Sequence, residues 1–221
     1  MKEEVLLNTP KFGIIKINSV HFNDKDYFKR DDILNYKVNK INIWTGKKED
    51  KDVIIGIQFF YKNIFTGKTV SPGSHIGTEQ NIHLHEILLG TTEYLTEFKI
   101  RIDSEVTQIK FISNLNQKYE FGGEIGEEKI NDLEDKKYVI ICPFGCTTNY
   151  LDSCGFWYVD KLTIFQKHLI GYIELRILLR NRKEFKERIK NSKYDFPYNV
   201  LIRACSTPDI IFTTILKYCL F

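Results

Sequence analysis

The strongest candidate for a binding site lies in residues 144–159, which read FGCTTNYLDSCGFWYV. Polar residues in the middle of this segment separate two runs of strand-like composition, so it predicts a strand, a tight loop and a second strand. Asp152 follows the polar residues, and its carboxylate can accept two hydrogen bonds from vicinal hydroxyls while backbone N–H groups of the loop bind the same ligand. The competing interpretation is a turn aspartate that bonds to its own backbone.

Histidines and cysteines offer weaker candidates for a metal site. His83 and His85 flank Leu84 and lie on one face if the segment is a strand, and His75 precedes them. No carboxylate or thiolate is in register with this pair, so a solvent-facing strand is favoured over a metal site. A second group consists of Cys142, Cys146, Cys154 and His168. Its spacing does not match a recognised zinc site, and the cysteines on or beside predicted strands, Cys142 and Cys154, are expected to act as small hydrophobic residues.

Bulk composition excludes several functional classes. The chain has 221 residues and a net charge of +3, which gives no support for a nucleic-acid partner. There is no apolar stretch of the ~18 residues that a membrane span needs, and the start lacks a signal-peptide pattern. The five cysteines show no disulfide framework, so an intracellular location is expected. Phosphate-binding, nucleophile-elbow and metalloprotease motifs are absent, and we predict a protein without cofactor or catalytic activity.

The elements that must position these residues are short strands. Apolar runs separated by turn residues, with no helical pattern between them, predict an all-β fold. The residues between 62 and 79 are rich in Gly, Pro, Ser and Thr and read as a long loop. The expected strands are 38–45, 53–61, 82–89, 94–102, 106–112, 118–121, 138–142 and 156–159.

Several segments in a fixed order resemble one known family. They are 38–43 followed by Gly46, 55–61, 93–96, 109–114 followed by Gly122-Gly123, and the YLDSCG of 150–155. Over about residues 36–159, and more loosely from residue 10, their order and spacing are similar to jacalin-related lectins. This resemblance implies a β-prism of three four-stranded antiparallel sheets around a pseudo-threefold axis, with no enzymatic activity. The domain is expected to span residues 10–160.

The resemblance also implies a sugar site of two loops. In the family, the aspartate acts with backbone N–H groups of its own loop and of an N-terminal loop that carries adjacent glycines. Here the N-terminal segment has only Gly13, and Thr148 stands where the loop glycine is expected, so both halves depart from the pattern. A Cβ at residue 148 also restricts how closely a sugar approaches the backbone. The candidate carbohydrate-binding residues are Asp152, Tyr150, Leu151, Thr148, Asn149 and Gly13.

Residues 161–221 follow a different pattern and predict a helical C-terminal extension. The last predicted helix starts after Ser206-Thr207-Pro208-Asp209 and is apolar on most faces, so it should be buried on the β domain or on a partner protein. Its candidate docking residues are Ile211, Phe212, Ile215, Leu216 and Tyr218.

The two departures in the sugar loops and the apolar extension together favour a non-catalytic interaction module. It would serve as a structural subunit of an intracellular assembly, for which a cytoskeletal or ciliary complex is the candidate setting. The alternative is a true lectin that binds mannose-like or galactose-like sugars through the Asp152 loop.

Overall fold

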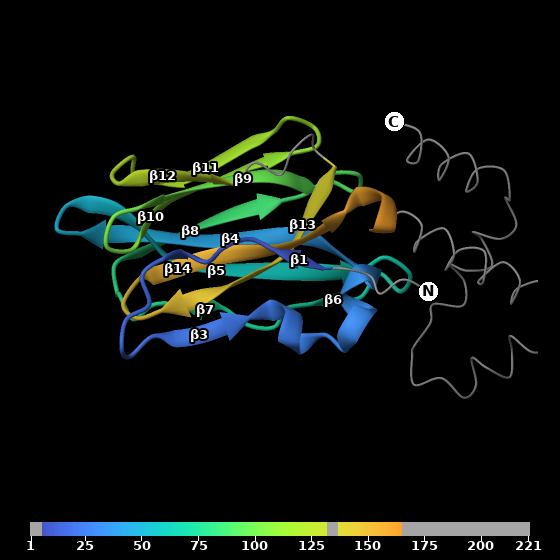
Figure 1. Cartoon of the computed structure of the whole chain (residues 1–221), viewed down its shortest axis with the longest axis horizontal. Helices are drawn as coiled ribbons and strands as arrows, with labels where there is room; N and C mark the ends of the chain where they lie inside the picture. Colours follow the sequence, from blue (N-terminus) through green and yellow to red (C-terminus); the bar gives the residue numbers. More distant parts are fainter. Residues whose placement is uncertain (1–5, 132–136, 165–221) are drawn as a thin grey trace, which may run out of the picture. The chain divides into compact units, whose positions relative to one another are not determined.

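The computed structural model describes residues 6–131 and 137–164, which fold into three antiparallel β-sheets (Figure 1). The first sheet has the order β1 (Leu7–Asn8), β14 (Leu151–Asp160), β13 (Tyr138–Thr147) and β3 (Val20–Asn23), and β2 (Phe12–Gly13) also pairs with β14. The second has the order β6 (Thr69–Val70), β5 (Lys51–Asn63), β4 (Tyr36–Lys48) and β8 (Ile82–Leu88), and β7 (His75–Ile76) also pairs with β5. The third has the order β11 (Lys118–Gly122), β10 (Val106–Ser113), β9 (Leu95–Ile102) and β12 (Glu127–Asn131). Two 3₁₀ helices, η1 (Asp24–Tyr27) and η2 (Arg30–Asn35), connect β3 to β4.

This architecture confirms the predicted all-β prism, with one difference in strand count. Two sheets contain five strands instead of four, because one edge of each sheet is broken into two short pieces. Pro10 separates β1 from β2 along β14, and Pro72 separates β6 from β7 along β5. Proline has no N–H to donate and interrupts a ladder, which edge strands tolerate. The segment expected to be a long loop, 62–79, therefore holds two short strands.

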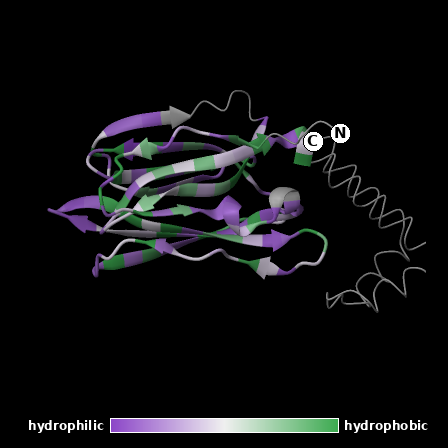
Figure 2. Cartoon of the chain, turned by 60° about the horizontal axis from the view of Figure 1, so that its bottom comes forward, coloured by the Kyte–Doolittle hydropathy of each residue, from purple (hydrophilic) through white to green (hydrophobic). Residues whose placement is uncertain are grey.

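The core lies where the three sheets face one another. Hydrophobic and hydrophilic residues alternate along many strands (Figure 2), as expected when one face of each sheet is buried. Phe156 of β14 packs against Phe98 of β9, Phe111 of β10 and Phe59 of β5, with ring centroids 4.6, 5.4 and 6.1 Å away. Because these four buried rings come from all three sheets, the cluster holds the sheets together.

The first sheet contains strands from both ends of the described chain. β3 pairs with β13, while β1 and β2 pair with β14, so residues near the N-terminus complete a sheet whose central strands lie after residue 137. Trp157 of β14 also donates its indole N–H to Asn23 Oδ1 at 2.9 Å. At the end of β14, the Asp160 side chain accepts the backbone N–H of Leu162 at 2.7 Å, and residues 161–164 are helical. The predicted extension otherwise lies outside the described residues, and the domain boundary at residue 160 stays a prediction.

No helix in the described ranges is both long enough and apolar enough to cross a bilayer.

Glu93, between β8 and β9, has a buried carboxylate held by specific donors. Its Oε2 accepts the Gly90 N–H at 3.1 Å, and its Oε1 accepts the Tyr119 hydroxyl at 2.8 Å. Burial raises the pKa of Glu93. These two bonds, a hydrogen bond from Ser113 and the charge of Lys37 lower it, and their combined effect is larger than that of burial. The net result is a pKa below the ordinary value of a glutamate.

This lowered pKa predicts a specific loss of stability in acid. A carboxyl group with a lower pKa in the folded chain contributes stability above the unfolded pKa of about 4.3, and loses it as the pH falls through the folded value. We expect the free energy of unfolding of the wild-type chain to decline more steeply with acid than that of Glu93→Gln. Urea titrations between about pH 3 and pH 6 measure this difference. Glu124→Gln, at an exposed position, is the matched control, and parallel profiles for wild type and Glu93→Gln would contradict the assignment.

Candidate functional site

The hairpin between β13 and β14 forms as predicted, but Asp152 does not lie in its loop. The strands pair up to Cys146 and Ser153, and a register irregularity follows before Thr147 pairs with Leu151. The turn itself is short, and the Thr148 N–H donates to the Tyr150 carbonyl at 3.0 Å. Asp152 is the second residue of β14. The predicted loop carboxylate is therefore a strand residue, because β14 begins earlier than the sequence pattern suggested.

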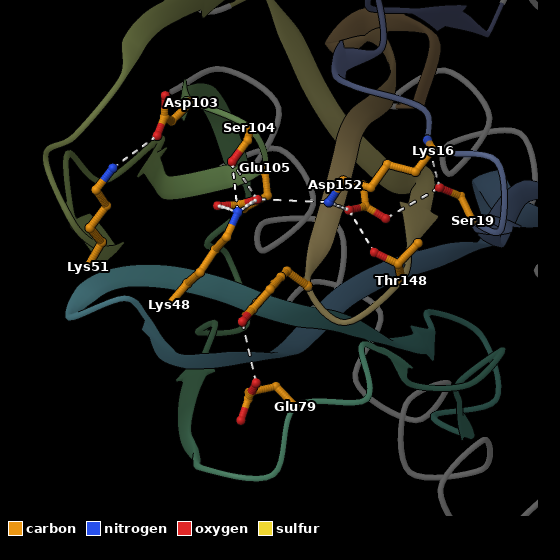
Figure 3. A network of polar contacts seen from close by, with 11 residues as sticks. Lys16, Ser19, Lys48, Lys51, Glu79, Asp103, Ser104, Glu105, Thr148 and Asp152 are labelled. Carbon is orange, nitrogen blue, oxygen red and sulfur yellow. Dashed lines mark hydrogen bonds and ion pairs between the residues drawn. The ribbon is translucent and has the colours of Figure 1, made fainter.

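The Asp152 carboxylate is fully buried and accepts hydrogen bonds from three side chains (Figure 3). Lys16 Nζ lies 2.5 Å from Oδ1, Thr148 Oγ1 lies 3.0 Å from the same oxygen, and Ser19 Oγ lies 3.3 Å from Oδ2. Burial of a carboxylate requires such compensation. The charge of Asp152 is thus satisfied within the protein, by side chains and not by the backbone of its own turn.

Gly13 brings the N-terminal segment against the start of β14. It has a φ of +119°, and a Cβ at this position would lie 2.2 Å from the Asp152 carbonyl oxygen. Only glycine adopts this conformation and this close approach without strain. The next residue, Ile14, donates its N–H to that carbonyl at 3.1 Å, and a turn closed by the Ser19 N–H and the Lys16 carbonyl follows. Gly13 therefore positions the loop that supplies Lys16 and Ser19.

An alternating chain of charges continues from Asp152 to the other two sheets (Figure 3). Lys16 Nζ lies 3.8 Å from Glu105 Oε2, and that carboxylate accepts from Lys48 Nζ at 2.7 and 2.9 Å. The hydrogen bond to Glu105 raises the pKa of Lys48. The two acids are buried, with side chains 0% and 3% exposed, whereas the side chains of Lys16 and Lys48 are 36% and 28% exposed. The network ties β14, the turn before β10 and the end of β4 together.

Beside this network is an open hollow of about 740 Å³. One wall is the segment after β7, where the Thr78 N–H donates to the Thr148 carbonyl at 3.2 Å and the Glu79 N–H to the Asn149 carbonyl at 3.3 Å. Tyr150 packs against a buried cluster that includes Trp44, and its hydroxyl lies 3.4 Å from Glu79 Oε2. The lining residues are Ile15, Lys16, Ile17, Asn18, Val20, Thr78, Thr148, Asn149 and Tyr150.

The predicted carbohydrate-binding residues gather at this place but in different roles. Thr148, Asn149 and Tyr150 line the hollow, whereas Gly13, Leu151 and Asp152 do not. Leu151 is buried in the core, and Gly13 and Asp152 position the loop. The sequence interpretation missed three polar lining residues. Lys16 and Asn18 interrupt an apolar run, GIIKINSV, which is a usable signal, but nothing local distinguishes Thr78 from other residues of its loop.

Two of the histidines considered as metal ligands have other partners, and His83 is exposed. His75 Nε2 lies 2.6 Å from Asp24 Oδ1, and His85 Nε2 lies 2.9 Å from Thr45 Oγ1, so His85 is not a purely solvent-facing residue. Within residues 6–131 and 137–164, no three His, Cys, Asp or Glu side chains are arranged to hold a metal ion. Three cysteines, Cys142, Cys146 and Cys154, are free and buried there. His168 lies outside the described residues.

A known family model matches most of the described part of the chain. Residues 22–157, or 136 of the 221 residues, match the model of the jacalin-like lectin domain. The chain belongs to the jacalin-like lectin domain family. The predicted resemblance is therefore confirmed for this domain. Of the segments that line the hollow, those at residues 78 and 148–150 lie within the matched region, and the N-terminal segment directly precedes it. Comparison with curated protein sequences finds no match.

Solved structures share the fold of this jacalin-like lectin domain. AcmJRL, a mannose-binding jacalin-related lectin from Ananas comosus, is 20% identical with a TM-score of 0.54, over 70% of this chain and 98% of that lectin. Calystegia sepium agglutinin is 19% identical with a TM-score of 0.56, over 71% and 98%. Malaysian banana lectin is 14% identical with a TM-score of 0.55, over 71% and 100%. At these identities the similarity establishes the β-prism architecture.

The predicted partner-docking residues of the extension, Ile211, Phe212, Ile215, Leu216 and Tyr218, lie outside the described residues. Docking of a partner protein through them stays a prediction.

Proposed function

We propose that this jacalin-like lectin domain binds a carbohydrate, without catalysis, in the hollow beside the β13–β14 hairpin. The observation that carries the proposal is the composition of the hollow, whose wall combines amide and hydroxyl groups with exposed apolar side chains. Ligand sites are concave and combine apolar walls with a few placed polar groups. The mannose-binding lectin AcmJRL has the same fold, which supports a saccharide as the ligand.

The polar and the apolar side chains of the hollow can each interact with a different part of a sugar. The Thr78 hydroxyl donates to Asn149 Oδ1 at 2.8 Å, which leaves the Thr78 oxygen as an acceptor and the Asn149 NH₂ group as a donor for sugar hydroxyls. The amide of Asn18 can donate and accept in the same way. Ile17 and Val20, which are 102% and 69% exposed, offer apolar surface to the C–H faces of a ring. Asp152 serves by holding Lys16, Ser19 and Thr148 in place, not by touching the ligand.

A glycan array followed by titration calorimetry tests this proposal. The full chain is expected to give saturable binding, and Thr78→Leu with Asn149→Leu should weaken it at least about tenfold, because two polar partners are removed and the hollow is partly filled. Thr91→Leu with Gln117→Leu is the matched control, since these exposed residues lie at the opposite end of β9 and β10 from the Glu105 turn. Failure of every glycan to bind, or equal binding by both double variants, would refute the assignment of the hollow.

The role of structural subunit in an intracellular assembly has less support. Of the observations that favoured it, the apolar extension lies outside the described residues. Thr148, one of the two departures in the sugar loops, donates its hydroxyl to Asp152. An intracellular location and a cytoskeletal or ciliary setting stay predictions.

A further inference from the structure

The charges around the hollow are distributed unevenly between its wall and the interior. Among the described residues that line it, Lys16 alone carries a full charge. Tyr150 is neutral at physiological pH, because the ordinary pKa of a tyrosine is about 10 and burial and the nearby Glu79 raise it. The two carboxylates of the adjoining network, Asp152 and Glu105, lie behind the wall. The lining itself therefore carries one positive charge and no carboxylate, and Glu79 Oε2 lies 3.4 Å from the hydroxyl of the lining residue Tyr150.

The Asp152 carboxylate is not accessible to a pair of sugar hydroxyls. Its side chain is 0% exposed, and both of its oxygens already accept hydrogen bonds from the protein. A diol would have to displace Lys16 and reach a buried oxygen. That exchange would leave the ammonium without its closest partner, at a cost that a neutral hydrogen bond does not offset.

Lys16 is held in a position to act as a donor. Asp152 Oδ1 lies 2.5 Å from its Nζ, and Glu105 Oε2 lies 3.8 Å away on the other side. An ammonium carries three N–H donors, and the structure assigns one of them to Asp152. The Lys16 side chain is 36% exposed and lines the hollow. Its contact with Glu105 is longer than a hydrogen bond, so the donors not used by Asp152 have no hydrogen-bond acceptor among the contacts of this network.

We propose that the hollow selects a saccharide that carries an anionic group, a carboxylate or a sulfate, and that Lys16 is the residue that determines this specificity. This inference rests on the proposed carbohydrate-binding function. A charge-assisted hydrogen bond to an ammonium is shorter and stronger than a neutral one. The two carboxylates and two ammonium groups of the network have no net charge in total. The side chains of Lys16 and Lys48 are partly exposed, whereas those of Asp152 and Glu105 are buried.

Matched sugars provide the first test. Oligosaccharides that end in glucose, glucuronate, glucose 6-sulfate, galactose and galacturonate are titrated into the full wild-type chain by calorimetry. We expect the anionic member of at least one pair to bind about tenfold more tightly than its neutral counterpart. This preference should shrink when the NaCl concentration rises from about 0.05 to 0.5 M, because salt screens an exposed charge. The carboxylate and sulfate arms identify which anion is preferred.

Variants at residue 16 provide the second test. Lys16→Met alone would leave Asp152 buried without its cation, so the informative variant is Lys16→Met with Asp152→Asn, which removes both charges and keeps similar volumes. It should lose the preference for anionic sugars while a thermal melt shows that it remains folded. Lys16→Arg should retain the preference within a few-fold. Lys118→Met, at an exposed position of β11, removes the same charge elsewhere and should change nothing.

Three outcomes separate the two proposals. Loss of the anionic preference in Lys16→Met with Asp152→Asn, and its retention in the other two variants, supports the role of Lys16. Tighter binding of neutral sugars by wild type, or an unchanged anionic preference in the double variant, overturns the inference and leaves carbohydrate binding intact. Absence of binding by every sugar overturns both.

Discussion

Replacing Phe156 with alanine is expected to lower the free energy of unfolding by about 3–5 kcal/mol. The ring is fully buried and contacts Phe98, Phe111 and Phe59, which belong to the other two sheets. Its removal loses the burial of an aromatic side chain and leaves a cavity among rings from all three sheets, where close packing limits collapse. Because domains are stable by only about 5–15 kcal/mol, this loss is a large share of the total.

Urea unfolding followed by tryptophan fluorescence measures this change. Leu88→Ala is the control, because Leu88 is 70% exposed on the edge strand β8 and its truncation should cost less than about 0.5 kcal/mol. Phe156→Leu, which retains part of the volume, should fall between the two. Similar midpoints for Phe156→Ala and Leu88→Ala would mean that the aromatic cluster does not hold the sheets together.

Replacing Asp24 with alanine is expected to lower the free energy of unfolding by about 2–4 kcal/mol. Asp24 is the first residue of η1, and its buried carboxylate accepts the Tyr61 hydroxyl at 2.5 Å and contacts His75 Nε2 at 2.6 Å. Without it, the hydroxyl of Tyr61, a fully buried residue of β5, loses its acceptor, and β7 loses its tie to η1. Burial already raises the pKa of Tyr61 well above its ordinary value, so this hydroxyl remains a donor.

Asp24→Asn is the matched variant, because it retains the size and one carbonyl acceptor and should lose less than half as much stability. A double-mutant cycle of Asp24→Ala with Tyr61→Phe isolates the hydrogen bond, because each substitution removes one partner, and we expect a coupling energy of about 1–2 kcal/mol. Additive effects of the two substitutions would show that the short contact contributes nothing to stability.

The central departure from the family pattern has a structural explanation. Thr148 adds a Cβ to the loop, but its hydroxyl also donates to Asp152, and Lys16 from the N-terminal loop occupies the same carboxylate. The aspartate of YLDS is thus retained in the fold with different contacts. The hollow remains open beside it, so the proposed ligand meets Lys16, Asn149 and Tyr150.

Local sequence was sufficient for the strands and the family. Alternation of apolar and polar residues has a period of two, and it located most of the long strands from β4 to β14 because one face of each is buried. It failed for the short strands β6 and β7, where two residues are too few to show a period. It also assigned Asp152 to the loop before β14, although Asp152 belongs to that strand.

Tertiary structure alone decided which side chain meets which. Lys16 and Asp152 are 136 residues apart, and Asp24 is 51 residues from His75 and 37 residues from Tyr61. A residue's type states what it can donate or accept, but its partner depends on how β2 and β14 are brought together at Gly13. For that reason the carboxylate could be identified in the sequence, whereas its burial and its contact with the partly exposed Lys16 could not.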